Sequence, residues 1–119
     1  MAKVIDWKDL IDRLEDENLI LEIVPEFLEN DNEYLEQIAS AINSDDAEQL
    51  QITAHTLKGA AATVGAVALS EKAKALELIA EELKLDQAES IIEEIKVELD
   101  KVRDLLSKPN WAEIVKADT

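Results

Sequence analysis

The order of apolar and polar positions predicts a series of helices. Apolar residues recur every three or four positions along almost the whole chain, which is typical of amphipathic helices. The first segment covers residues 6–14, with Asp6 as its cap, and the second covers residues 17–29. Because Pro25 lies within the second segment, we expect a kink or an unusually long first turn there. The predicted inner faces consist of Leu10, Ile11, Leu14, Leu19, Ile20, Ile23, Phe27 and Leu28.

Capping residues separate the next two segments. Asp31 or Asn32 is expected to cap a third helix, which Asn43-Ser44 can end. Asp45 is expected to open a fourth helix, and Gly65 ends it as a C-terminal cap residue does. The apolar residues are Tyr34, Leu35, Ile38 and Ile42 in the third helix, and Ala47, Leu50, Ala54, Leu57, Ala61 and Val64 in the fourth.

Two further stripes and a short tail complete the pattern. Asp86 is expected to cap the sixth helix, which stops before Pro109. The apolar stripes are Leu69, Ala73, Leu76, Ala80 and Leu83 in the fifth helix, and Ile91, Ile95, Leu99, Val102 and Leu106 in the sixth. Whether the tail residues Trp111, Ile114 and Val115 dock or fray does not follow from the sequence.

Short loops between long amphipathic helices imply antiparallel neighbours. We therefore predict an all-α fold, an up-and-down antiparallel four-helix bundle with one or two short additional N-terminal helices. Residues 1–107 are predicted to form this domain, and residues 108–119 a C-terminal tail. The length of 119 residues suits one small domain, and the two glycines and two prolines also favour helices.

Composition and charge narrow the choice of function. The chain has no cysteine, so disulfides, thiolate metal sites and cysteine nucleophiles are excluded. Its formal net charge of −16 disfavours nucleic acid and anionic membranes as partners. No apolar run resembles a signal peptide or approaches the roughly 20 residues of a membrane span. We therefore expect a cytoplasmic protein with no membrane insertion.

The single histidine, His55, is predicted to face solvent from the middle of the fourth helix. On a helical wheel it lies roughly 140° from the centre of the apolar stripe. Gly59, four residues on, exposes backbone beside the imidazole at a cost of about 1 kcal/mol relative to alanine. Ala62 is also small, Ile52 is apolar outside the core stripe, and Lys58 is within reach. This surface is typical of a docking site.

The distribution of acidic residues supports the same interpretation. Residues 49–70 contain no Asp or Glu, although the chain has 28 of them in 119 residues. Carboxylates near His55 would repel an incoming phosphoryl group. An exposed neutral imidazole is a nucleophile that can accept such a group and later release it. Because the chain has no P-loop or other glycine-rich phosphate loop, we do not expect it to take phosphate from ATP.

These residues resemble the signature of histidine phosphotransfer (HPt) domains. The matching run is His55-Thr56-Leu57-Lys58-Gly59-Ala60-Ala61, followed by Val64-Gly65-Ala66, Leu69, Ala73 and Leu76-Glu77. Ile5-Asp6-Trp7 and Phe27-Leu28 are similar to the opening helices of that family. The resemblance extends from residue 5 to residue 106, and the second glycine, ten residues after the histidine, makes it specific.

The resemblance implies a phosphorelay intermediate in two-component signalling. It implies that His55 is the phospho-acceptor, that Lys58 stabilises the phosphoryl charge, and that Gly59 permits close approach. The implied partners are receiver domains of response regulators or hybrid sensor histidine kinases, and the magnesium involved would belong to the receiver. Some members have a glutamine 22 positions after the histidine that helps to orient the imidazole. Here that residue is Glu77, and its role stays open.

Two other classes of function are alternatives to phosphotransfer for this sequence. An acidic helical adaptor would carry His55 as an ordinary surface residue, with Lys58 solvated and Ile52 and Ala62 belonging to a wide core face. A di-iron bundle needs Glu-x-x-His pairs from several helices, which one histidine cannot supply. We expect no cofactor on this chain. We expect a monomer, because the docking face must stay free, although an apolar patch around Ile52 would also suit self-association.

Overall fold

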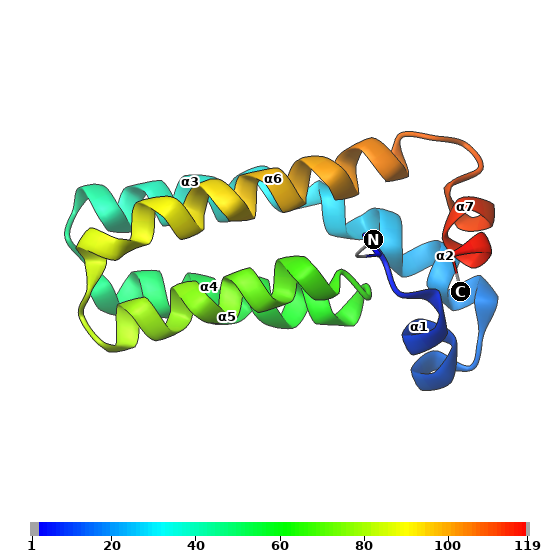
Figure 1. Ribbon diagram of the computed structural model, residues 1–119, viewed down its shortest axis with the longest axis horizontal. Coiled ribbons are helices and arrows are strands. Elements are labelled where there is room, and N and C mark those ends of the chain that lie inside the picture. Colours follow the sequence, from blue (N-terminus) through cyan, green and yellow to red (C-terminus); the bar gives the residue numbers. More distant parts are fainter. Residues whose placement is uncertain (1–2, 119) are drawn as a thin grey trace.

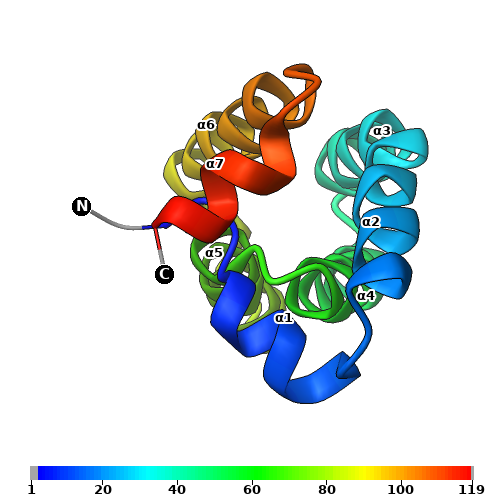
Figure 2. The same cartoon turned by 90° about the vertical axis from the view of Figure 1, so that its right-hand side faces the viewer.

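A computed structural model describes residues 3–118 of the chain. Four long helices, α3 to α6, run antiparallel to one another as a bundle, as Figure 1 shows. Three shorter helices gather at one end of this bundle (Figure 2). The α-helices are α1 (Trp7–Leu14), α2 (Glu17–Glu26), α3 (Asp31–Asn43), α4 (Ala47–Thr63), α5 (Val67–Glu81), α6 (Ala88–Leu106) and α7 (Trp111–Ala117), with 3₁₀ turns η1 (Phe27–Glu29) and η2 (Leu85–Gln87). The predicted fold class is confirmed.

The core consists largely of the inner faces that the apolar periodicity predicts, but the prediction for Leu19 is wrong, because this residue of α2 is 38% exposed. On α4, the stripe of Leu50, Ala54, Leu57 and Ala61 is fully buried. On the neighbouring α5, Ala73 and Ala80 are buried as well. Small side chains at these positions let the two helices approach closely, and α4 and α5 form the most extensive helix pair in the bundle. This packing places the outer edge of α5 beside the helix that carries His55.

The start of α4 differs by one residue from the prediction. Asp46, not Asp45, is the N-cap, and its side chain accepts a hydrogen bond from the backbone N–H of Gln49 at 3.0 Å. Asp45 instead adopts a positive φ of 52°, which acidic residues tolerate in tight turns. The connection from α3 therefore uses one more residue than the sequence pattern suggests.

Neither of the residues predicted to cap α3 does so. Asn30 occupies the N-cap position without a side-chain hydrogen bond, and the helix begins at Asp31. The Asp31 side chain is buried and ion-paired with Arg103, whose Nη2 and Nε lie 2.5 Å and 2.9 Å from Oδ2. This ion pair ties the first turn of α3 to the end of α6. Asn32 only donates its backbone N–H to Asp31.

The connection between α5 and α6 also departs from the prediction. Leu83 was predicted on the inner face of α5, but it follows the helix, has a φ of 59° and is 76% exposed. The N–H groups of Leu83 and Lys84 bond back to Ala80 and Ile79 at 3.1 Å and 2.9 Å, which closes the end of α5. Asp86 lies inside η2, and Gln87 takes the N-cap position of α6.

Residues 17–29 form two elements where the apolar pattern predicts one. Pro25 lies in the last turn of α2, which ends at Glu26 and is followed directly by η1. Proline has no N–H group, and its ring crowds the carbonyl group four residues earlier. The predicted kink or long first turn is therefore a helix end.

The residues after Pro109 form α7 and dock on the rest of the molecule. Trp111 and Val115 are buried in the core. Lys116 lies 4.9 Å from the centre of the Trp7 ring and pairs with Glu17. These C-terminal residues therefore dock and do not fray, and they pack against α1 and α2. Within residues 3–118, no helix is long and apolar enough to cross a membrane.

Candidate functional site

The C-terminal end of α4 is closed by Gly65. The backbone N–H groups of Gly65 and Ala66 bond to the carbonyl oxygens of Ala62 and Ala61 at 3.1 Å and 2.9 Å, the pattern of a Schellman cap. Gly65 has a φ of +73°, and a Cβ there would lie 3.0 Å from the Leu10 side chain. Its carbonyl oxygen accepts a hydrogen bond from the N–H of Asp6 at 2.9 Å. Glycine is required here both by conformation and by space, and the end of α4 is thereby joined to α1.

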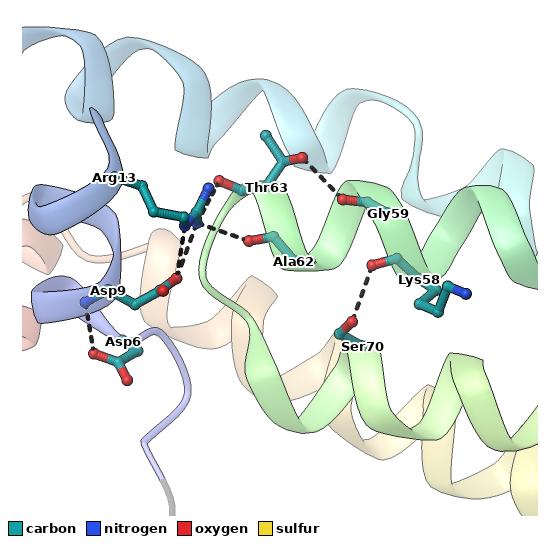
Figure 3. A network of polar contacts seen from close by, with 8 residues as sticks. All are labelled: Asp6, Asp9, Arg13, Lys58, Gly59, Ala62, Thr63 and Ser70. Atoms are coloured by element: carbon teal, nitrogen blue, oxygen red, sulfur yellow. Dashed lines mark hydrogen bonds and ion pairs between the residues drawn. The ribbon is translucent and has the colours of Figure 1, made fainter.

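Arg13 of α1 completes this junction, as Figure 3 shows. Its Nη2 donates to the carbonyl oxygens of Ala62 and Thr63 at 2.9 Å and 3.4 Å. Asp9 holds the guanidinium from the other side, with 3.0 Å between Asp9 Oδ2 and Arg13 Nε. The last carbonyls of a helix have no partner within the helix, and Arg13 supplies one. The sequence indicates only the Asp9–Arg13 pair, four residues apart on α1, and not its target.

His55 projects from the middle of α4 into solvent. Its side chain is 67% exposed, while its neighbours Ala54 and Leu57 are fully buried. The predicted orientation of the histidine is therefore confirmed. The residues predicted to surround it are exposed as well: Ile52 is 52% exposed, and Ala62 also faces solvent. A Cβ added to Gly59 would meet no atom within 4 Å, so the backbone there is open to approach.

A carboxylate from α5 contacts the imidazole directly. Glu77 Oε2 lies 2.6 Å from His55 Nδ1, and Glu77 Oε1 lies 2.7 Å from Lys58 Nζ. The expectation that negative charge is kept away from His55 is therefore wrong, although residues 49–70 themselves contain no acidic side chain. Sequence distance misses this contact, because Glu77 is 22 residues away and reaches the histidine through the close packing of α4 and α5.

The Glu77 carboxyl is held in its charged form. Hydrogen bonding to Lys58 lowers its pKa from the usual value of 4.5, burial opposes this effect, and the hydrogen bond to His55 lowers the pKa further. An ionised carboxylate only accepts hydrogen bonds, so His55 Nδ1 must carry the proton in this contact. The lone pair of the neutral ring then resides on Nε2, which is the nitrogen directed away from Glu77.

Lys58 is anchored at both ends. Its side chain is 29% exposed and pairs with Glu77, while its backbone carbonyl accepts a hydrogen bond from Ser70 Oγ at 3.0 Å (Figure 3). Lys58 is thus within reach of the histidine face, as predicted, but its ammonium group is already paired. The three side chains of His55, Glu77 and Lys58 form a linked row in which a single carboxylate bridges a nucleophilic ring and a cation.

This arrangement suits group transfer to an exposed ring nitrogen. The nucleophilic nitrogen faces solvent, its tautomer is fixed by a charged partner, and a cation lies on the same surface. Among residues 3–118, no group of three or more histidine or acidic side chains is placed to hold a metal ion. The candidate chemistry therefore rests on His55 and its two charged neighbours.

Comparisons with known proteins indicate the family of the chain. The family model described as "Hpt domain" matches residues 22–105, which include His55, Lys58 and Glu77. Among solved structures, histidine-containing phosphotransfer protein B from Pseudomonas aeruginosa PAO1 is similar over 98% of both chains, with a TM-score of 0.79 and 27% sequence identity. A search of curated proteins found no match.

Proposed function

The chain belongs to the Hpt domain family, and on this premise we propose that it relays phosphoryl groups on Nε2 of His55. Members of this family are phosphotransfer intermediates in phosphorelays and not kinases. The observation that carries the assignment to His55 is its contact with Glu77, which leaves Nε2 as the exposed nucleophile. His55 is also the single histidine of the chain.

The transfer step begins with a phosphorylated aspartate of a receiver domain. The Nε2 lone pair attacks phosphorus, and the bond between phosphorus and the aspartate oxygen breaks, with its electron pair leaving on the carboxylate. The ring keeps its proton on Nδ1 and gains positive charge as the new bond forms. Glu77, which accepts that proton's hydrogen bond, stabilises this charge by direct electrostatic attraction. In the reverse direction, an aspartate carboxylate attacks and His55 leaves as a neutral imidazole.

Lys58 provides the cation for the transferred group. Phosphoryl transfer depends mainly on positioning and on stabilising charge at the phosphoryl oxygens. Glu77 holds the Lys58 ammonium group on the Nδ1 side of His55, and we propose that the lysine side chain turns from Glu77 toward those oxygens during transfer. The bridge to Glu77 places the lysine before the phosphoryl group arrives.

The partner is expected to dock over the open part of α4. Gly59 lets its backbone approach, and Ile52 and Ala62 provide apolar contact on either side of His55. The magnesium of the reaction is assigned to the receiver domain, and the sequence contains no ATP-binding motif of its own. We further propose that the chain acts as a monomer in the cytoplasm, with this face free for successive partners.

Transfer from a labelled receiver domain tests the proposal. The receiver is phosphorylated with acetyl phosphate and incubated with the wild-type chain and with His55→Gln. Wild type should acquire an acid-labile phosphoryl group, and His55→Gln should acquire none. A wild-type chain that never accepts label, or a His55→Gln variant that accepts it equally, would leave an acidic helical adaptor as the better description.

A further inference from the structure

Three helices of the bundle end in the same hydrogen-bonded turn. After α3, α4 and α5, two successive N–H groups bond back to carbonyl oxygens three and five residues earlier, which is the pattern of a Schellman cap. The first residue of each pair has a positive φ, and it is Asp45 after α3, Gly65 after α4 and Leu83 after α5. Glycine adopts this left-handed conformation freely and aspartate is enriched in it, but a bulky apolar residue rarely adopts it. Leu83 is therefore the exception among the three.

The Leu83 side chain gains little burial in return for this conformation. Among residues 3–118 it is the most exposed of the large apolar side chains. The left-handed backbone destabilises an L-residue, and an exposed leucine contributes little hydrophobic stabilisation. The stability of the fold therefore gives no reason for a leucine at position 83. Residues held in such conformations cluster at functional sites.

A hollow of about 390 Å³ lies beside Leu83, at the end of the bundle opposite α1, α2 and α7. The α3–α4 and α5–α6 connections meet at this end (Figure 1). The hollow is lined by Asp45, Ala47, Leu83, Leu85 and Asp86, and we call these five residues the distal surface. Its apolar part combines the exposed Leu83 with the partly buried Ala47 and Leu85. An apolar contact between two carboxylates is thus available to a partner.

Acidic residues surround the distal surface. The segments 44–48 and 81–89 contain seven acidic residues and one lysine. That lysine, Lys84, pairs with Glu82, with 3.0 Å between Nζ and Oε2. Residues 49–70, which carry His55, contain no acid, so the two surfaces differ in charge. A second copy of this chain, with its net charge of −16, is repelled at the distal surface, whereas a partner with lysine or arginine beside an apolar contact is attracted.

We propose that the distal surface docks a protein that surrounds Leu83 with apolar side chains and pairs lysine or arginine with Asp45 and Asp86. The inference goes beyond the proposed phosphotransfer and does not rest on it, because no residue of the distal surface takes part in the chemistry at His55. Ala47 and His55 are eight residues apart on α4, which is about 12 Å along the helix axis. The basic partner therefore binds a surface separate from the one that carries the histidine.

The variant Leu83→Gly separates stability from binding. Glycine relieves the left-handed backbone and removes the apolar side chain, so the Tm should rise by about 3 °C while partner binding is lost. Glu15→Gly is the matched control for the backbone, because Glu15 has a φ of 57° at the other end of the molecule. Val97→Ala is the matched control for the loss of an exposed apolar side chain. A Leu83→Gly chain with a lower Tm than wild type would overturn the proposal, because the leucine would then stabilise the fold.

Site-specific crosslinking in cells of the organism that encodes the chain identifies the partner. The photoreactive residue p-benzoylphenylalanine replaces Glu82, which leaves Leu83 in place, and replaces Val97 in a control chain. The protein crosslinked at position 82 and not at position 97 is purified and titrated with the full chain by calorimetry. Wild type should bind it at least tenfold more tightly than Leu83→Gly, and about 0.5 M sodium chloride should weaken that binding.

The control variants should bind the purified partner within twofold of wild type, and so should His55→Gln. A partner that binds Leu83→Gly as tightly as wild type would overturn the proposal. So would the absence of a crosslink at position 82 beyond that at position 97, or a crosslink only to a second copy of the chain. Binding that is lost in His55→Gln would place the partner at the histidine and would also overturn it.

Discussion

Glu77 and His55 are 22 residues apart in the chain, and 2.6 Å separates Glu77 Oε2 from His55 Nδ1. The contact sets the ring tautomer and brings a negative charge to the nitrogen that does not react. In the same carboxyl group, Oε1 holds Lys58 at 2.7 Å. One acidic residue of α5 thus organises both groups on α4 to which the proposed reaction assigns a role.

Replacing Glu77 should slow phosphoryl transfer without removing it. In Glu77→Ala, the ring loses a hydrogen bond to a charged group, an interaction of about 1.5–3 kcal/mol. If about 1.4 kcal/mol of this acts in the transition state, transfer slows about tenfold. Glu77→Gln keeps an acceptor for Nδ1 but lacks the charge, so its transfer rate should lie between those of wild type and Glu77→Ala. Stopped-flow or quench-flow measurement of transfer from a phosphorylated receiver checks this order, and equal rates for all three proteins would exclude a positioning role for Glu77.

The same carboxyl group should make stability depend on pH. The pKa of Glu77 is lowered in the folded chain, chiefly by its hydrogen bond to Lys58, so its ionised form stabilises the fold above the usual pKa of 4.5. That contribution is lost as the pH falls through the lowered value. Wild type should exceed Glu77→Gln in free energy of unfolding at pH 7, and the difference should shrink below about pH 4. Urea unfolding at several pH values measures this difference in free energy of unfolding. A difference that grows in acid would contradict a stabilising role for the ionised Glu77 carboxylate.

At Gly59, stability and transfer should respond in opposite directions. A Cβ there meets nothing within 4 Å, and glycine in a helix interior costs about 0.5–1 kcal/mol relative to alanine. Gly59→Ala should therefore raise the free energy of unfolding by about that amount. A bulky replacement such as Gly59→Trp should leave the fold intact and slow transfer by more than tenfold. Unchanged transfer in the tryptophan variant would remove the argument for docking over Gly59.

Gly65 provides the contrasting case on the same helix. Its φ is +73°, and an added Cβ would lie 3.2 Å from the carbonyl oxygen of Asp6. A left-handed conformation alone costs an L-residue about 1–2 kcal/mol. Gly65→Ala should therefore lower the free energy of unfolding by at least that much, measured by urea titration beside Gly59→Ala. Equal effects of the two substitutions would show that the tight junction of α1 and α4 contributes little.

The periodicity of apolar residues was sufficient to predict the bundle and the exposure of His55. Leu50, Ala54, Leu57 and Ala61 recur at helical spacing, and the histidine lies off that stripe, so local geometry decides its orientation. Helix starts were less predictable. Asp45 and Asp46 are both good caps by residue type, and the structure uses the second.

Contacts between distant residues could not be predicted from local pattern. Asp31 resembles a helix cap, yet it pairs with Arg103, 72 residues away. Arg13 resembles one half of a surface pair on α1, yet it also binds the end of α4, 49 residues on. Glu77 belongs to the same class, because its role depends on which face of α5 packs beside α4. The sequence identifies His55 as the reactive residue because its exposure follows from local helix geometry. The residues that contact one another across the fold are known only from the structure.

The site of phosphorylation is the most direct test of the proposed relay. The chain, labelled with ¹⁵N in its histidine, is phosphorylated by a receiver domain, and the ring nitrogens are observed by NMR. Coupling between phosphorus and Nε2 of His55, with Nδ1 protonated and bonded to Glu77, is the expected result. Coupling to Nδ1, or a phosphorylated chain whose histidine shows no coupling to phosphorus, would contradict the proposal.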